Sequence, residues 1–123
     1  MKTILISILI LFSINGFAFN WKKVIDSVDG ESYYVDVDNI KKHNGLVYYW
    51  FLVDLPKLKI GDHSLISRWK VDCGEEKQTI LSHTYYSQAM GKGRITFDDT
   101  FNKINYPKPN TVGHTTMKFV CDY

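Results

Sequence analysis

Residues 46–55 read LVYYWFLVDL, and this stretch decides which fold the chain can adopt. Successive side chains of a β-strand point to opposite faces of the sheet. One face would carry Val47, Tyr49, Phe51 and Val53, and the other Leu46, Tyr48, Trp50 and Leu52. A strand that is apolar on both faces is normally covered on both sides. We therefore expect a central strand, with a helix on one side and a second layer or a partner subunit on the other.

Five further stretches have the composition of short strands: residues 21–27, 32–37, 64–73, 79–86 and 94–97. Turn sequences such as Asp29-Gly30 and Asn44-Gly45 separate them. Short connections of this kind favour antiparallel neighbours. Residues 38–42 break the alternation, and Asp38 or Asn39 is expected to cap a single helical turn there. The sequence thus predicts an antiparallel meander of about six strands.

The last patterned segment is TVGHTTMKFVC, residues 111–121. Asn110 or Thr111 is the expected N-cap of a helix that follows a proline-containing turn. The stripe facing the sheet would consist of Val112, Thr116, Met117, Val120 and Cys121. Gly113 and three threonines lower helix propensity, which leaves a strand-like ending as the alternative. The expected fold class is α+β, with a C-terminal α-helix packed on one face of the sheet.

The first twenty residues have the organisation of a secretion signal. Lys2 is their only charge, residues 4–14 are almost wholly apolar, and the small residues Gly16 and Ala18 follow. We expect a signal peptide at residues 1–18 and one domain at residues 19–123. An uncleaved anchor is the alternative, but the apolar run is too short for a transmembrane span. No cysteine lies near the cleavage site, so we expect a periplasmic, secreted or surface protein without a lipid anchor.

The chain has two cysteines, Cys73 and Cys121. In an oxidising compartment such a pair normally forms a disulfide, the alternative being two reactive or intermolecular thiols. Alternation places Cys73 on the apolar face of its strand, together with Trp69 and Val71. A disulfide would therefore clamp the C-terminal helix onto that face. On the chain-entropy model the loop it closes stabilises the domain by roughly 4 kcal/mol.

Charge and motif spacing exclude several kinds of site. The formal net charge is +2, with no basic stripe of the kind that binds nucleic acid. His43, His63, His83 and His114 are too scattered for a local metal site, and no cofactor is expected. Asp36 and Asp38 lack the rest of a calcium loop, and are expected to form a solvated turn. Ser67 and Lys70 have serine-acylase spacing, but in a strand they would point to opposite faces. Without a catalytic set, we do not expect an enzyme.

Aromatic doublets are the most unusual feature of the chain. They are Tyr33-Tyr34, Tyr48-Tyr49 and Tyr85-Tyr86, and Trp50 follows the second. Each doublet sends one ring to each face of its strand. The outward set, which we predict as a binding surface, consists of Tyr34, Tyr48, Trp50 and Tyr86, because Tyr and Trp are enriched at interfaces. The alternative is that both sets are covered inside the fold or by a dimer.

An ordered set of motifs extends from Trp21 to Cys121. After Trp21 come YYVDVDNI at residues 33–40, VYYWFLVDL at 47–55, SLISRWKVDCG at 64–74, YYSQAMGKG at 85–93 and VC at 120–121. In order and spacing they resemble the bacterial surface-adhesin protein E family. The resemblance implies an antiparallel sheet with a helix held against one face by a disulfide. It also implies a non-enzymatic surface protein that binds host matrix or serum proteins and can form a homodimer.

The chain departs from the family's named member, a lipoprotein, because it has no lipidation cysteine. The first functional expectation is a cell-envelope binding protein whose partner is a host matrix or envelope protein. The alternative is a small periplasmic ligand-binding protein, with a pocket lined by Trp and Tyr between sheet and helix. A hydrolase ranks last.

Overall fold

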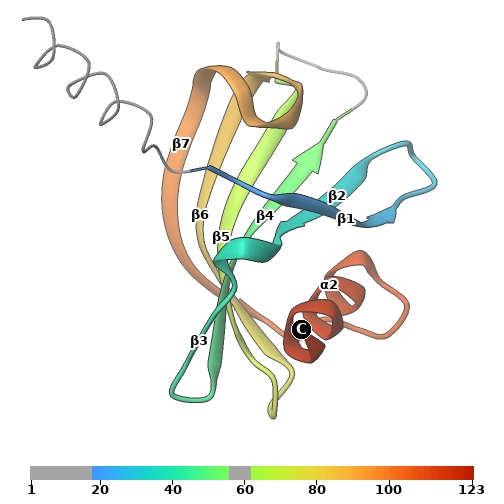
Figure 1. Cartoon of the computed structure of the whole chain (residues 1–123), viewed down its shortest axis with the longest axis vertical. Coiled ribbons are helices and arrows are strands. Elements are labelled where there is room, and N and C mark those ends of the chain that lie inside the picture. The colour runs from blue at the N-terminus through green and yellow to red at the C-terminus, as the bar shows by residue number, and fades with distance from the viewer. Residues whose placement is uncertain (1–17, 56–61) are drawn as a thin grey trace, which may run out of the picture.

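The computed structural model describes residues 18–55 and 62–123 of the chain. They form a seven-stranded antiparallel sheet and one α-helix (Figure 1). The strands are β1 (Trp21–Asp26), β2 (Ser32–Asp36), β3 (Lys41–His43), β4 (Leu46–Asp54), β5 (Ser64–Asp72), β6 (Lys77–Gln88) and β7 (Lys92–Asn105). The helix is α2 (Val112–Asp122), and two 3₁₀ turns are η1 (Val37–Asn39) and η2 (Ala89–Gly91). Most of the predicted signal peptide, residues 1–17, lies outside the described residues.

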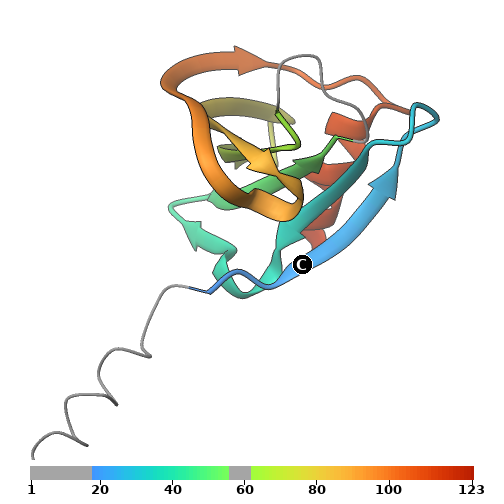
Figure 2. The same cartoon turned by 90° about the horizontal axis from the view of Figure 1, so that it is seen from above.

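The strand order is β1-β2-β4-β5-β6-β7, and β3 pairs with β4 beyond the end of β2. β4 pairs with β5 from Leu46 to Asp54, and its other edge is shared by β2 and β3. The prediction of a central strand at residues 46–55 is therefore confirmed. The sheet is strongly curved, as the view from above shows (Figure 2).

The main core lies between α2 and one face of the sheet. Its buried members are Val35, Val47, Tyr49, Phe51, Val53, Val71, Met117 and Val120. The helix contacts β1 and β4, so it covers the β1 side of the sheet and leaves β7 on the other side of the molecule (Figure 1). The alternation predicted for β4 is confirmed, because the four side chains expected on one face all belong to this core.

The predicted C-terminal helix and its disulfide bond to the sheet are both present in the structure. Thr111 is the N-cap, and its Oγ1 accepts a hydrogen bond from the His114 N–H at 3.2 Å. Thr116, Met117 and Val120 are the buried residues of the helix. Cys73, directly after β5, forms a disulfide with Cys121 in the last turn of α2. The predicted pairing is confirmed.

The turn η2 covers the opposite face of the sheet. Leu52 and Ile66 are buried there, although neither belongs to the helix-side core. Gly91 packs so closely on them that a Cβ at this position would lie 2.6 Å from Ile66 Cδ1. The Ser64 hydroxyl holds the turn in place, since it donates to the Gln88 carbonyl at 2.6 Å and accepts from the Gly91 N–H at 2.8 Å.

Two expectations about local structure need correction. The helical turn predicted at residues 38–42 is η1, and its cap is Asp36 rather than Asp38 or Asn39. Asp36 is fully buried and accepts from the backbone N–H groups of Asn20 and Asp38. The strand predicted at residues 94–97 is the longer β7, which continues to Asn105. Solvent reaches both faces of this edge strand, so apolar and polar residues do not alternate along it and its full length could not be recognised from the sequence.

Candidate binding surface

The four aromatic residues predicted as a binding surface share one face of the sheet. Tyr34 lies opposite Leu52 in the β2–β4 pair, and Trp50 and Tyr48 follow Leu52 at intervals of two along β4. Their side chains therefore stand on the face opposite α2.

Tyr86 lies on the same face, as two successive strand pairings show. It pairs with Ser64, and Ser64 pairs with Asp54, which is two residues from Leu52 along β4. The register therefore places on one face residues that lie more than fifty positions apart in the chain. Leu52 and Ile66, which η2 covers, lie between Tyr86 and Trp50. We call this set, Tyr34, Tyr48, Trp50 and Tyr86, the aromatic face.

Arg68 was not among the predicted residues, yet it lies on the same face, beside Trp50 and Tyr48. It pairs with Trp50 across β4–β5, and its guanidinium carbon is 4.7 Å from the Trp50 ring centroid and 5.9 Å from that of Tyr48. Both distances are within cation–π range. Burial lowers the pKa of Arg68, while Tyr48 and Asp36 act in the opposite direction. Its Nη1 is buried and has no hydrogen-bond partner among the described residues.

The residues just before β1 cover part of Trp50. Phe19 stacks on Trp21 with ring centroids 4.6 Å apart, and its edge meets Trp50 at 6.2 Å. Trp50 is thus enclosed by Phe19 on one side and Arg68 on another. Each of the four predicted aromatic residues is partly buried rather than fully exposed.

A group of five exposed apolar side chains belongs to β7 and the residue after it. They are Ile95, Phe97, Phe101, Ile104 and Tyr106, whose exposed fractions range from 36% to 66%. The strand predicted at residues 94–97 contained Ile95 and Phe97, but it ended too early to include Phe101 and Ile104. The apolar letters at positions 95, 97, 101 and 104 are the signal that a longer strand assignment would have used.

A pocket of about 260 Å³ opens on the face opposite α2, near one end of β4–β7. Its lining residues are Leu46, Lys70, Asp72, Lys77, Thr79, Asn102 and Ile104. None of them is Trp or Tyr, so this pocket differs from the aromatic one expected between sheet and helix.

His83 and Ser67 form a partly buried polar contact on the helix side of the sheet. Their Nδ1 and Oγ atoms are 2.6 Å apart, and Asp99 lies opposite His83 in the β6–β7 pair. The residue types match a serine-hydrolase triad, but a nucleophile must be accessible to substrate. Ser67 is only 1% exposed. Burial also lowers the pKa of His83, which favours the neutral imidazole.

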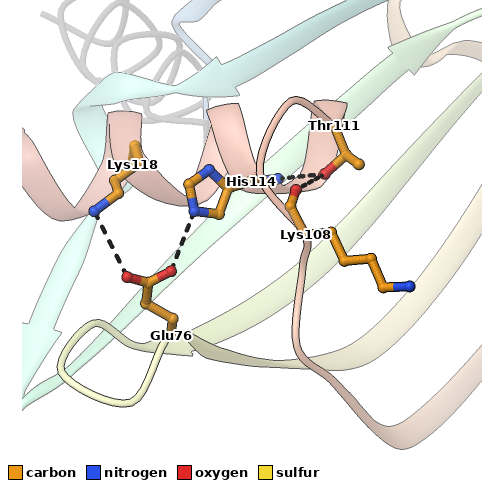
Figure 3. Close-up of polar contacts among 5 residues, drawn as sticks. All are labelled: Glu76, Lys108, Thr111, His114 and Lys118. Carbon is orange, nitrogen blue, oxygen red and sulfur yellow. Dashed lines mark hydrogen bonds and ion pairs between the residues drawn. The ribbon is translucent and has the colours of Figure 1, made fainter.

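His114 joins the helix to the β5–β6 turn (Figure 3). Its Nε2 is 3.1 Å from Glu76 Oε1, and Lys118 Nζ is 3.8 Å from Glu76 Oε2. The contact is electrostatic and largely exposed, so it supports the position of α2 only weakly. Within residues 18–55 and 62–123, no three His, Cys, Asp or Glu side chains converge in a way that would hold a metal ion.

A family model described as surface-adhesin protein E matches residues 21–122, which is most of the chain. The chain belongs to the surface-adhesin protein E family. The motifs from Trp21 to Cys121 therefore led to the correct family. A search of curated proteins gave no match.

Solved structures of protein E from Haemophilus influenzae share the fold of this family member. Crystal form II gives a TM-score of 0.69 at 17% identity, covering 87% of this chain and 91% of that chain. A selenomethionine form gives 0.63 at 16% identity, covering 87% and 89%. Protein E from a non-typeable strain gives 0.58 at 17% identity, covering 88% and 79%. Among the described residues, no helix has the length and hydrophobicity needed to span a membrane.

Proposed function

We propose that this member of the surface-adhesin protein E family is an exported, non-enzymatic protein that binds a host matrix or envelope protein through its aromatic face. Family membership supports a role in adhesion. The observation that carries the choice of surface is the strand register, which places Tyr34, Tyr48, Trp50 and Tyr86 on one face. The predicted signal peptide at residues 1–18 supports export.

The chemistry of the aromatic face suits protein recognition. Tyr, Trp and Arg are the residue types that most often contribute strongly to binding energy at interfaces. Here Arg68 is held against Trp50 and Tyr48, so the side chains are ordered before a partner arrives. Ordering in advance reduces the entropy cost of association.

The test compares binding by matched variants of the chain from residue 19 onward. Immobilised wild-type protein is exposed to matrix proteins and to an envelope extract, and the captured proteins are identified. The double variant Tyr34→Ser, Tyr86→Ser should bind a captured partner at least about tenfold more weakly, as expected for aromatic residues at an interface. Tyr123→Ser removes an exposed tyrosine at the end of α2, outside the aromatic face, and should bind as wild type.

Equal binding by the double variant would place the contact elsewhere on the molecule. Cell fractionation tests the adhesion role separately, because confinement of the protein to the periplasm would rule out contact with a host. Sedimentation of the purified protein tests whether a homodimer covers the aromatic face. If the wild-type protein forms a dimer and the double variant does not, then the aromatic face binds a second copy of this chain rather than a different protein.

The second candidate is a carrier of small ligands in the periplasm. The pocket of about 260 Å³ favours it over a hydrolase, because Ser67, the serine that contacts His83, is only 1% exposed. Native mass spectrometry of the protein purified from its own periplasm would reveal a co-purifying ligand.

A further inference from the structure

The pocket on the face opposite α2 is built by two rows of side chains that cross the sheet. In the first row Leu46 pairs with Asp72 and Asp72 with Lys77. In the second row Lys70 pairs with Thr79 and Thr79 with Ile104. Together with Asn102 these residues enclose about 260 Å³. The walls come from four strands, so the sheet itself fixes the positions of the lining side chains.

A β-bulge determines which residues of β6 face the pocket. Arg68 pairs with Ser82, but the next residue, Trp69, pairs with Ile80, so Leu81 is extra. Without this extra residue, Lys70 would pair with Ile80 and the pocket would lose Thr79. The bulge therefore turns Lys77 and Thr79 toward the pocket and leaves Gln78 buried on the helix side.

The charges of the pocket are not balanced. Lys70 and Lys77 supply two ammonium groups, and neither forms an ion pair anywhere in the described parts of the chain. Asp72 is the only acidic lining residue, and its Oδ1 already accepts a hydrogen bond from the Glu75 N–H at 3.1 Å. One positive charge remains in excess. The pocket therefore attracts an anion. An anion with an apolar body can also pack on Leu46 and Ile104, which inorganic phosphate cannot do.

The remaining lining is part apolar and part hydrogen-bonding. Leu46 and Ile104 form an apolar wall, and Ile104 is 51% exposed although it lies in a strand. Thr79 and Asn102 add uncharged polar groups. The volume is slightly below the range typical of drug-sized ligands, so only a small molecule fits.

From these features we propose that the pocket binds a small monocarboxylate with a short apolar body. The carboxylate lies between the ammonium groups of Lys70 and Lys77, and the apolar body packs on Leu46 and Ile104. The aromatic face supplies none of the lining residues, so this site does not depend on the proposed protein-binding function.

The test titrates the ¹⁵N-labelled chain from residue 19 onward with sodium hexanoate and follows amide chemical shifts. Saturable shifts should centre on Lys70, Thr79 and Ile104, with a dissociation constant of roughly 1 mM for so small a ligand. Hexylamine has the same chain with the opposite charge and should not bind. Inorganic phosphate should bind more weakly than hexanoate.

Lys70→Gln and Lys77→Gln should each weaken hexanoate binding at least about fivefold, because each removes one of the two cations facing the carboxylate. Lys103→Gln is the matched control, since Lys103 neighbours Ile104 in sequence but pairs with Ile80 and so faces the other side of the sheet. Circular dichroism verifies that each variant is folded. Equal binding of hexanoate and hexylamine, tighter binding of phosphate, or no saturable shift at these residues would each overturn the proposal.

Discussion

Gly91 lets the turn η2 pack closely on Ile66 and Leu52. Its φ of +70° is in the left-handed region, and the space where a Cβ would stand is occupied by Ile66. Gly91→Ala should therefore combine backbone strain with overpacking and lower the free energy of unfolding by about 3 kcal/mol. Gly45 has a similar φ of +79° but nothing within 4 Å, so Gly45→Ala should cost only about 1 kcal/mol. Denaturant unfolding measures both, and equal losses would contradict the packing argument.

His83 should make the stability of the protein sensitive to acid. Burial lowers its pKa below the ordinary value of 6.5, so the unfolded chain takes up a proton more readily than the folded one. Its contribution to stability is complete above about pH 6.5 and is lost as the pH falls toward the lower folded pKa. His83→Gln should therefore lose less stability than wild type between about pH 8 and about pH 5.

Thermal unfolding across that pH range tests the effect of His83. Ser67→Ala provides a second comparison, because it removes the hydrogen bond at 2.6 Å but leaves the imidazole buried. Since burial is the cause of the lowered pKa, this variant should keep the wild-type pH dependence. If Ser67→Ala abolished it instead, the hydrogen bond rather than burial would be responsible.

At the scale of the element, the helix depends on its covalent link to the sheet. Cys73→Ser and Cys121→Ser each remove the same disulfide, so each should lower the free energy of unfolding by roughly 4 kcal/mol. The double variant should lose little more than either single variant. Unfolding of all three in parallel is the measurement, and additive losses would show that the two cysteines act separately.

Element prediction from the sequence worked where one face of an element is buried. The stripe Thr116, Met117 and Val120 marked the helix, and alternation through residues 46–55 marked β4. It failed for β7, because an edge strand that is solvated on both faces has no reason to alternate. It also misplaced the cap of η1, because Asp36 falls inside the strand predicted at residues 32–37, while its side chain caps the turn that follows.

At the scale of the molecule, the candidate sites differ in how far they could be predicted. The members of the aromatic face could be chosen because strict alternation fixes one ring of each doublet. The pocket could not, since it needs the pairing of four strands and the bulge at Leu81. Arg68 pairs with Ser82, so a regular register without the bulge would pair Lys70 with Ile80 rather than with Thr79.

The residues before β1 should contribute to the stability of the whole domain. The Asn20 N–H donates to Asp36 at 3.0 Å, the Asn20 carbonyl accepts from the Val37 N–H at 3.1 Å, and Phe19 stacks on Trp21. A chain beginning at Trp21 loses all three contacts. We expect it to be about 2–3 kcal/mol less stable than one beginning at Phe19, which denaturant unfolding can measure.

Phe19→Ala in the longer chain separates the contributions of these residues. It keeps both backbone contacts of Asn20 and removes only the aromatic stacking, so its stability should lie between those of the two chains. A Phe19→Ala variant as unstable as the chain beginning at Trp21 would assign the whole effect to the ring.

The packing of α2 on β1 has a consequence for biogenesis. A chain exported from its amino end delivers β1 first and α2 last, yet the two shield the same apolar surface. Until α2, residues Val112–Asp122, has crossed, the apolar face of β1 has no helix to pack against. Formation of the disulfide must likewise wait for Cys121, which lies 48 residues after Cys73 in the chain. For an exported chain, closure of the core would therefore follow the passage of α2, and a chain cut before Cys121 would have an open core and an unpaired thiol.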